Sequence, residues 1–333
     1  EKIRFLVDKK FWFEKYRDSY ERVNVKNIQF CCTHRISQGK FINERLHRHF
    51  GMVITKDWDV DKTSRVFSII AQSYLERTNH RLRNVQEVYV GCVIDFLERC
   101  KSTFVPSPNH PHYRFGFFEG MNILGGILGI SSRSLKYSGP PQKARLVMHE
   151  CMRVIGDRMM MQQDVVKLKA LISSTIVDHF GNDLGIDKLV DGSGDASSEF
   201  WRSKIYEVCE LKKKPLIFTD LVGSEGYIEL TRLERAQDIL KECATKMCEN
   251  AIMNGDPIPA IVPFHFTVKH FLRASRILSK TNNHILMTGH ASSGKHTVMQ
   301  LVAQAHGMEY QEVNVDKIKL FCMWGSVLRN ILL

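Results

Sequence analysis

The clearest pattern along the chain is the recurrence of apolar residues three and four positions apart, which is the spacing of one face of an α-helix. In residues 144–161, Val147, Cys151 and Val154 share such a face with Ile155 and Met159. The same spacing predicts helices over residues 66–74, 85–96, 230–254, 264–278 and 298–305. Much of the middle of the chain is therefore predicted to be helical.

Three short apolar runs have a different character and predict strands. They are residues 25–32, 51–55 and 285–288. Each is rich in β-branched or aromatic residues, or lies next to turn-forming residues. The first is predicted to be a buried strand. The last precedes a glycine-rich loop and a helix, so the chain changes there to a strand–loop–helix order.

Proline, glycine and serine mark the breaks between these elements. Residues 105–112 contain three prolines and form the strongest break, which predicts a domain boundary. Residues 131–141 are predicted to be a loop, and residues 191–198 a surface loop or a tether. The basic run Lys212 to Lys214 is predicted to be a solvated turn before Pro215.

Composition limits the class of protein. With 333 residues, 44% hydrophobic and 25% charged, the chain is long enough for two or three packed globular units. Its longest apolar run, residues 123–130, is too short to cross a bilayer, so no membrane role is expected. The net charge of +11 is spread along the chain, so no nucleic-acid partner is expected either.

Cysteine usage and the first residue bear on context. The nine cysteines form no CxxC pair, which predicts reduced thiols in an intracellular protein. No signal-peptide pattern opens the chain. Since residue 1 is a glutamate, we expect the sequence to be an excerpt of a longer one.

The motif with the most chemistry is a phosphate-binding loop (P-loop, Walker A) of the form GxxxxGK. It lies between the predicted strand at 285–288 and the predicted helix at 298–305, as the motif requires. Its glycines let the backbone turn N–H groups toward phosphate oxygens, the helix N-terminus adds positive potential, and Lys295 would reach the β- and γ-phosphates. The predicted nucleotide-binding residues are Gly289, His290, Ala291, Ser292, Ser293, Gly294, Lys295, His296 and Thr297.

The metal-binding part of this motif departs from the rule. A Ser or Thr normally follows the lysine and binds Mg²⁺, but here His296 takes that place and Thr297 comes one residue late. An imidazole is a poor ligand for Mg²⁺. Either Thr297 binds the metal from a shifted position, or the site binds nucleotide and hydrolyses it poorly. No acidic Walker B strand follows, and Asp316 is interpreted as the exit of the next strand.

Five further segments are informative because of the order in which they occur. They are FWF and the run after it (residues 11–32), RLHRHF (45–50), HYRF (112–115), MHECMRVIGDRM (148–159) and KHFLRASRIL (269–278). In this order they resemble the motor region of dynein heavy chains, from the later part of the third AAA+ module into the start of the fourth. Dynein P-loops of that fourth module often place the hydroxyl residue one position late, as Thr297 is here.

The resemblance implies an α/β fold of AAA+ P-loop NTPase modules. Residues 1–105 would be the C-terminal part of a large parallel α/β domain of the third module, 106–258 its helical lid, and 259–333 the N-terminal part of the next large domain. The implied cofactors are ATP or ADP and Mg²⁺, with Thr297 as metal ligand. The role implied for this segment is regulatory or structural, because the family's main hydrolytic site lies in the first module.

The resemblance also assigns roles outside the P-loop. Arg45 or Arg48 would be an arginine finger for the nucleotide of the neighbouring module, and the alternative is that they pair with surface acids. Phe118 and Asn122 stand where arginines are expected. The first of those two arginines resembles a γ-phosphate sensor, so the third module's site is predicted to be weak or regulatory. Residues 33–40 also replace a Pro- and Gly-rich loop of the family.

Four other polar residues receive no chemistry from the sequence. His149 and Glu150 are expected to be framework residues of the lid. His47 and His49 are expected to form a basic surface strip, because the sequence pattern assigns them no cysteine or carboxylate as a metal-binding partner.

As a whole, the resemblance implies an ATP-driven, minus-end-directed microtubule motor in the cytoskeleton of a ciliary or flagellar axoneme, with the cytoplasm as the alternative location. The implied partners are microtubules and other dynein heavy, intermediate and light chains. Two rivals stay open: another P-loop NTPase, such as a nucleotide kinase or a non-motor AAA+ remodeller, and a scaffold with a degenerate P-loop.

Overall fold

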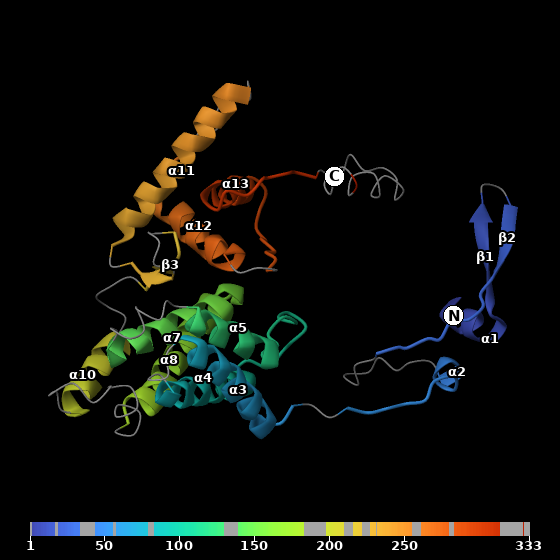
Figure 1. Ribbon diagram of the computed structural model, residues 1–333, viewed down its shortest axis with the longest axis horizontal. Coiled ribbons are helices and arrows are strands. Elements are labelled where there is room, and N and C mark those ends of the chain that lie inside the picture. The colour runs from blue at the N-terminus through green and yellow to red at the C-terminus, as the bar shows by residue number, and fades with distance from the viewer. Residues whose placement is uncertain are drawn as a thin grey trace. The chain divides into compact units, whose positions relative to one another are not determined.

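The structure is a computed structural model that describes most of the chain in two compact units, Glu1–Asp57 and Trp58–Leu333 (Figure 1). The described residues are 2–16, 19–33, 44–55, 58–78, 83–129, 139–182, 198–209, 216–221, 227–230, 232–254, 261–279, 283–313 and 329.

The first unit is built on a β-hairpin. Helix α1 (Lys2–Lys9) leads into strands β1 (Phe11–Tyr16) and β2 (Ser19–Asn24), which pair antiparallel. A short helix, α2 (Glu44–His47), lies further along the chain. The two strands pair with each other from Phe11 opposite Asn24 to Tyr16 opposite Ser19.

Aromatic side chains stabilise the base of this hairpin. The ring of Phe11 packs edge-on against Phe5, with centroids 5.3 Å apart, and against Phe13, with centroids 5.5 Å apart. The guanidinium of Arg22, on the paired strand, lies 3.9 Å from the centre of the same ring. This arrangement adds a cation–π contact to the cross-strand pairing.

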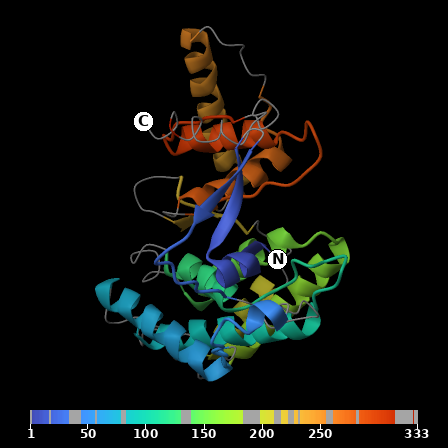
Figure 2. The same cartoon turned by 90° about the vertical axis from the view of Figure 1, so that its right-hand side faces the viewer.

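The first part of the second unit is an assembly of helices around one apolar core, called here the helical core. Within the described residues it contains α3 (Val60–Thr78), α4 (Arg83–Thr103), α5 (Phe117–Leu128), α7 (Pro140–Val154), the short 3-10 helix η2 (Gly156–Arg158), α8 (Gln162–Phe180) and α10 (Ser198–Cys209). Figures 1 and 2 both show these helices packed side by side.

Helix α4 is central to the helical core. It packs against α3, α5 and α8. Because it has neighbours on several sides, it buries Tyr89, Val93, Phe96 and Cys100, which recur at spacings of three and four residues. Each fully buried apolar side chain of this size contributes roughly 1.5–3 kcal/mol of transfer free energy.

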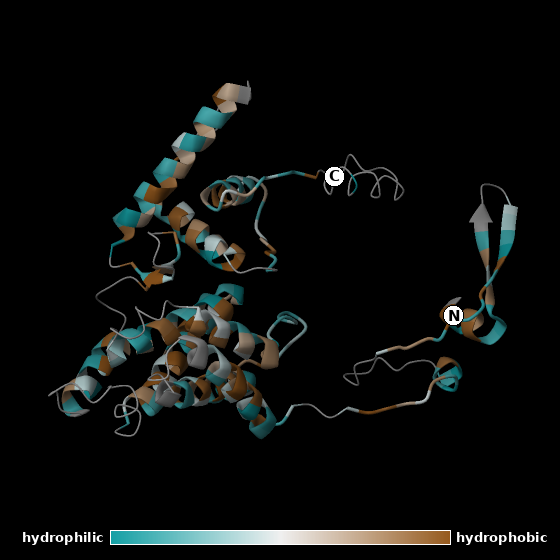
Figure 3. Ribbon diagram, in the orientation of Figure 1, coloured by the Kyte–Doolittle hydropathy of each residue, from teal (hydrophilic) through white to brown (hydrophobic). Residues whose placement is uncertain are grey.

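The C-terminal part of the second unit has a smaller core of its own, called here the P-loop core. A short antiparallel pair, β3 (Phe218–Thr219) and β4 (Ile228–Glu229), precedes helices α11 (Leu233–Asn254), α12 (His265–Leu278) and α13 (Lys295–Ala305). The three helices contact one another. Along α11, hydrophilic and hydrophobic bands alternate (Figure 3), as expected for a helix with one buried face.

The structure confirms the predicted helices. The periodic stretches at residues 66–74, 85–96 and 298–305 lie in α3, α4 and α13, and those at 230–254 and 264–278 correspond to α11, which begins at Leu233, and α12, which begins at His265. The helix predicted for 144–161 is shorter, because α7 ends at Val154 and continues as the turn η2 from Gly156. Coil at residues 104–116 separates α4 from α5, and both helices pack in the helical core.

The three strand predictions are wrong for the described structure. Residues 25–32, 51–55 and 285–288 are coil. The predicted burial of the first run is also wrong, since Ile28 is 59% exposed, and in the other runs Val53 and Leu286 are 88% and 90% exposed. A strand needs a neighbour for its backbone N–H and C=O groups, and both sheets in the described part of the chain are self-contained pairs.

Several other predictions fall on parts of the chain that are not described. They concern the loops at residues 34–40, 131–138 and 191–197, the turn at Lys212 to Lys214, and Asp316.

Candidate nucleotide-binding site

The P-loop is a sharp turn that leads directly into helix α13. Ser292 and Gly294 have left-handed backbone conformations, with φ of 57° and 79°. Gly294 is the N-cap of α13, and Lys295 is its first residue. A left-handed residue at this point is strained for any side chain with a Cβ, so glycine at 294 lets the loop reverse into the helix without that cost.

Lys295 closes the loop on itself. Its Nζ donates hydrogen bonds to the carbonyl oxygens of Gly289, at 3.0 Å, and His290, at 2.5 Å, and lies 3.3 Å from the hydroxyl of Ser293. The ammonium is therefore already held over the loop backbone. There it can exchange carbonyl oxygens for phosphate oxygens without a large movement of the side chain.

The end of α13 at the loop is suited to an anion. The first N–H groups of an α-helix have no partner within the helix, and they carry its partial positive charge. The first turn of α13 contains no acidic residue that would neutralise this charge. Val298, Leu301 and Val302 bury the other side of the helix in the P-loop core, which fixes its position.

The side chains after Lys295 fit phosphate better than they fit Mg²⁺. His296 is exposed, and its Nδ1 lies 3.3 Å from Oε1 of Glu312. Thr297 is half-buried on the first turn of α13. Successive helical residues point about 100° apart, so the hydroxyl of Thr297 does not take the direction of a hydroxyl at position 296. Metal binding by this chain's own residues therefore depends on Thr297 acting from a shifted direction.

The arginine-finger candidates lie in the first unit. Arg45 is on α2, and Arg48 follows it. Nη2 of Arg48 lies 3.3 Å from Oδ1 of Asp8, and Nε2 of His49 lies 2.7 Å from the same oxygen. Burial raises the pKa of the Asp8 carboxyl, but His49 and Arg48 outweigh it and hold that pKa below its usual value. For Arg48, pairing with an acid is thus observed.

The two positions where arginines were expected are both at the surface of α5. Phe118 is 78% exposed, and Asn122 is also exposed. Neither side chain can supply the positive charge of an arginine. The helix therefore offers no cation at these two positions for a phosphate.

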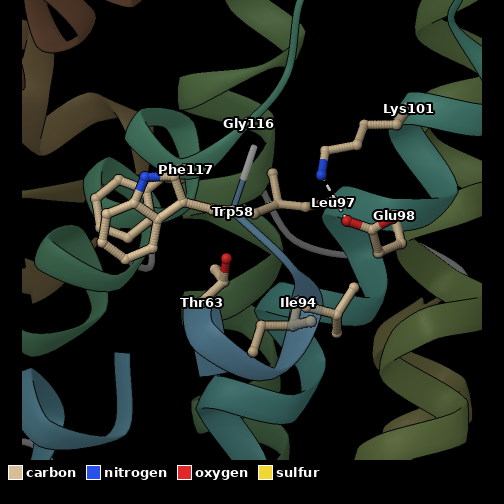
Figure 4. Close-up of a pocket in the computed structure, with 9 residues that line it drawn as sticks. Trp58, Thr63, Ile94, Leu97, Glu98, Lys101, Gly116 and Phe117 are labelled. Atoms are coloured by element: carbon tan, nitrogen blue, oxygen red, sulfur yellow. Dashed lines mark hydrogen bonds and ion pairs between the residues drawn. The ribbon is translucent and has the colours of Figure 1, made fainter. Parts of the chain in front are cut away.

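A pocket lies among α3, α4 and α5 (Figure 4). The ring of Trp58 stacks on Phe117 at one side, with centroids 4.9 Å apart, and Lys101 pairs with Glu98 at 2.5 Å on the other. The lining residues are Trp58, Val60, Thr63, Ile94, Leu97, Glu98, Lys101, Gly116 and Phe117. No P-loop residue is among them, so this pocket is separate from the candidate nucleotide site.

Two further features of the described residues concern metal ions and membranes. Within these ranges, no group of three or more His, Cys, Asp or Glu side chains is placed to hold a metal ion. None of the described helices is long and apolar enough to cross a membrane. The eight cysteines in the same ranges carry free thiols.

One cluster of buried polar residues was missed by the sequence reasoning. Glu150 is fully buried and His149 is 4% exposed, and Glu150 binds Arg276, which is 8% exposed. A signal for it was present, because Glu150 and Arg276 each lie beside the apolar stripe of a predicted helix. A charged residue in that position needs a buried partner.

The class of protein follows from two family matches. Residues 260–333 match the P-loop-containing dynein motor region D4, and residues 89–190 match the AAA+ lid domain. The P-loop at 289–297 lies inside the first match, and helix α7 lies inside the second. The chain is thus an AAA+ P-loop protein, which confirms the predicted fold class.

Individual relatives show which AAA+ proteins the chain is similar to. Over 325 residues, the chain is 25% identical to the ciliary dynein beta chain of Tripneustes gratilla and 26% identical to that of Heliocidaris crassispina. Over 319 residues, it is 24% identical to axonemal dynein heavy chain 17 of Homo sapiens. Each alignment covers 95% of this chain and 6% of the relative. Over nearly its whole length the chain is therefore similar to dynein heavy chains, and it spans about 6% of the length of the curated relatives it matches.

Proposed function

We propose that the chain binds ATP or ADP through residues 289–297 and that this nucleotide has a regulatory or structural role. The observation that carries the proposal is the loop itself: a left-handed turn at Gly294, a helix N-terminus without acids, and the Lys295 ammonium held over the loop. Backbone N–H groups would bind phosphate oxygens, and Lys295 would neutralise their charge. Mg²⁺ would be bound through Thr297 and the phosphates.

The function of the whole protein is proposed from its relatives. We assign it the activity of an ATP-dependent, minus-end-directed microtubule motor in the cytoskeleton of a ciliary or flagellar axoneme. Microtubules and other dynein heavy, intermediate and light chains are the proposed partners. The names of the relatives, ciliary and axonemal dyneins, favour the axoneme over the cytoplasm.

The division into modules and the arginine role belong to the same proposal. Residues 1–105 are assigned to the large domain of a third module, 106–258 to its lid, and 259–333 to the large domain of the fourth. Arg45 or Arg48 would reach the nucleotide of a neighbouring module. For Arg48, this role requires that it leave Asp8, which it contacts in the first unit.

The second candidate is a scaffold that keeps a P-loop without binding nucleotide. It is favoured by one observation, the imidazole of His296 at the position of a Mg²⁺-binding hydroxyl. Another kind of P-loop enzyme is disfavoured by the match of residues 260–333 to the dynein motor region D4.

The test is the Lys295→Ala variant, assayed with a fluorescent ATP or ADP analogue. Removing a charge-assisted contact to phosphate should weaken binding by about 10- to 100-fold. The matched control is Lys241→Ala, an exposed lysine of α11 whose partner, Asp238, lies on the same helix, and it should leave binding unchanged. If the unmutated protein bound no nucleotide, or Lys295→Ala bound it equally well, the scaffold would be the better description.

A further inference from the structure

The helical core and the P-loop core meet at a set of buried charges. Glu150 lies on α7, in the helical core, and Arg276 lies on α12, in the P-loop core. The two residues are 126 positions apart in sequence and 0% and 8% exposed. They belong to two of the sequence segments, 148–159 and 269–278, that received no chemistry from the sequence.

The contact between them is a two-point one. Nε of Arg276 donates to Oε1 of Glu150 at 3.2 Å, and Nη2 of Arg276 donates to Oε2. The hydroxyl of Tyr227 donates to Oε1 at 2.8 Å, and Nδ1 of His149 lies 3.2 Å from the same oxygen. Both oxygens of the carboxylate are therefore bound, and the plane of the guanidinium is fixed.

These partners keep the carboxylate ionised. Burial by itself raises the pKa of Glu150. The hydrogen bond with His149 and the charge of Arg276 outweigh burial and hold that pKa well below its usual range. The pair is thus a true ion pair in a dry environment, where loss of one partner leaves an uncompensated charge.

A second pair joins the same two helical regions. Nε of Arg273, one turn before Arg276 on α12, lies 3.3 Å from Oδ1 of Asp157 in η2. Arg153 of α7 lies 3.1 Å from the same oxygen. Residues three apart on a helix share a face, so α12 presents both of its arginines to acids at the end of α7.

The carboxylate of Glu150 also rests against α5. A Cβ built on Gly126 would lie 1.6 Å from Oε2 and 2.3 Å from Cδ of Glu150. No side chain larger than hydrogen fits there while Glu150 keeps its position. The position of α5 is thereby tied to the same carboxylate that binds Arg276.

On the other side, α12 is tied to the helix that begins at the P-loop. The hydroxyl of Ser275, adjacent to Arg276, lies 2.9 Å from Nε2 of His306, the C-cap residue of α13. Ser275 is fully buried. A continuous series of contacts therefore runs from α13 through Ser275 and Arg276 to Glu150, and from there to Gly126 on α5.

We propose that the Glu150–Arg276 pair is a positioning element that couples nucleotide at the P-loop to the helical core. A shift of α12 along α7 by 1–2 Å, of the size seen in allosteric helix movements, would separate two buried charges. The pair resists such sliding, so a change at α13 moves α12, α7 and α5 together. This proposal rests on the proposed nucleotide function of residues 289–297.

The experiment is hydrogen exchange of the whole protein, with and without ATP or ADP, followed in peptides from α13, α5 and α7. In the unmutated protein, nucleotide should slow exchange in all three helices, by about tenfold in α5 and α7. In the double variant Glu150→Met with Arg276→Met, α13 should still respond, while the change in α5 and α7 falls below about twofold. Unbranched apolar side chains of similar length replace a buried ion pair without a large loss of stability.

Two further variants separate coupling from folding. Arg99→Met removes two partly exposed ion pairs, one within α4, where Arg99 contacts Asp95 at 2.8 Å, and one between α4 and α8, where it contacts Asp178 at 2.7 Å. It should leave the response of α5 and α7 intact. Glu150→Gln keeps the shape of the side chain and a hydrogen bond with Tyr227, and it should lose the response as the double variant does. It provides the test if the double variant does not fold.

The outcomes separate the two proposals. A response of α5 and α7 that persists in a folded variant without the ion pair overturns the coupling. The coupling is also overturned if the unmutated protein binds nucleotide and exchange slows only in α13. If Lys295→Ala gives the same exchange pattern as the unmutated protein, the response does not come from this P-loop and the proposed nucleotide function fails first.

Discussion

The helical core and the P-loop core differ in how complete they are. In the helical core, each helix satisfies its own backbone hydrogen bonds and its apolar face meets other helices of the same core. In the P-loop core, the helices are equally regular, but residues 285–288 just before the loop are coil, and Leu286 is 90% exposed. An apolar run of this kind needs neighbouring strands, whereas a helix needs only a surface on which to pack.

The comparison teaches where the stability of the second unit lies. Packing of α13 rests on the buried Val298, Leu301 and Val302, whereas the segment that precedes the loop contributes only the half-buried Ile285 and Met287. The end of α13 at the P-loop is therefore positioned by the buried face of the same helix. The helical core, in contrast, is held from several sides and contains the buried charge of Glu150.

The largest expected effect is that of Gly126→Ala in the helical core. The new methyl group would overlap the carboxylate of Glu150 and force it away from Arg276. We expect the free energy of unfolding to fall by about 4 kcal/mol, measured by urea denaturation. The control is Gly91→Ala on α4, where a Cβ would meet only His179 atoms at 3.5 Å, and it should be neutral or stabilising. Equal effects of the two variants would contradict the close contact at Gly126.

The next largest expected effect is the pH dependence of the free energy of unfolding, which arises from His149 in the helical core. Burial lowers the pKa of His149 from 6.5 to about 4, against the opposing influence of Glu150 and with smaller contributions from Arg153 and Arg276. As the pH falls, the unfolded chain takes up this proton at a higher pH than the folded chain. The stability that neutral His149 contributes is therefore complete above pH 6.5 and is lost as the pH falls toward 4. It amounts to about 3 kcal/mol. Urea denaturation at several pH values should show that the free energy of unfolding depends less steeply on pH in His149→Gln than in the unmutated protein. An unchanged pH dependence would mean that the imidazole is solvated.

A smaller effect tests the P-loop core itself. Val302→Ala removes buried methyl groups from α13 and should lower the free energy of unfolding of this chain by about 2 kcal/mol. Leu286→Ala, in the exposed run before the loop, should change it by less than about 0.5 kcal/mol. Chemical denaturation of both variants measures the contrast. A large loss of unfolding free energy in Leu286→Ala would show that the Leu286 side chain is packed in solution.

The smallest expected effect is at the metal position. His296→Ser restores a hydroxyl directly after Lys295, where Mg²⁺ is usually bound. If the displaced hydroxyl of Thr297 limits hydrolysis, Mg²⁺-dependent turnover should rise several-fold, on the order of 1 kcal/mol in activation free energy. His290→Ser, a change in the same loop, serves as the control and should not raise turnover. No rise for His296→Ser would mean that another part of the protein limits hydrolysis.

The helices could be predicted because their signal is local. Apolar residues three and four positions apart define a face wherever that face later packs, and so α3, α4, α11, α12 and α13 were found from spacing alone. The strand predictions at 25–32, 51–55 and 285–288 are wrong, because these runs are coil. Their pairing depends on distant backbone, which a short apolar run does not specify.

The candidate site was predictable to a similar, partial extent. The order of residues 285–305 indicated a loop followed by a helix, and the left-handed turn at Gly294 agrees with that motif. The Glu150–Arg276 pair joins residues 126 positions apart, and no spacing rule connects them. Only the placement of two charges beside apolar stripes pointed to a buried partner.

The contact between Gly126 and Glu150 has an evolutionary consequence. Because the two positions share one small volume, neither can change freely while the other stays the same. Among related chains, a side chain at position 126 should therefore occur together with a shorter or apolar residue at position 150, and position 276 should then no longer be restricted to arginine. These three positions should vary as one unit, although they lie on three different helices.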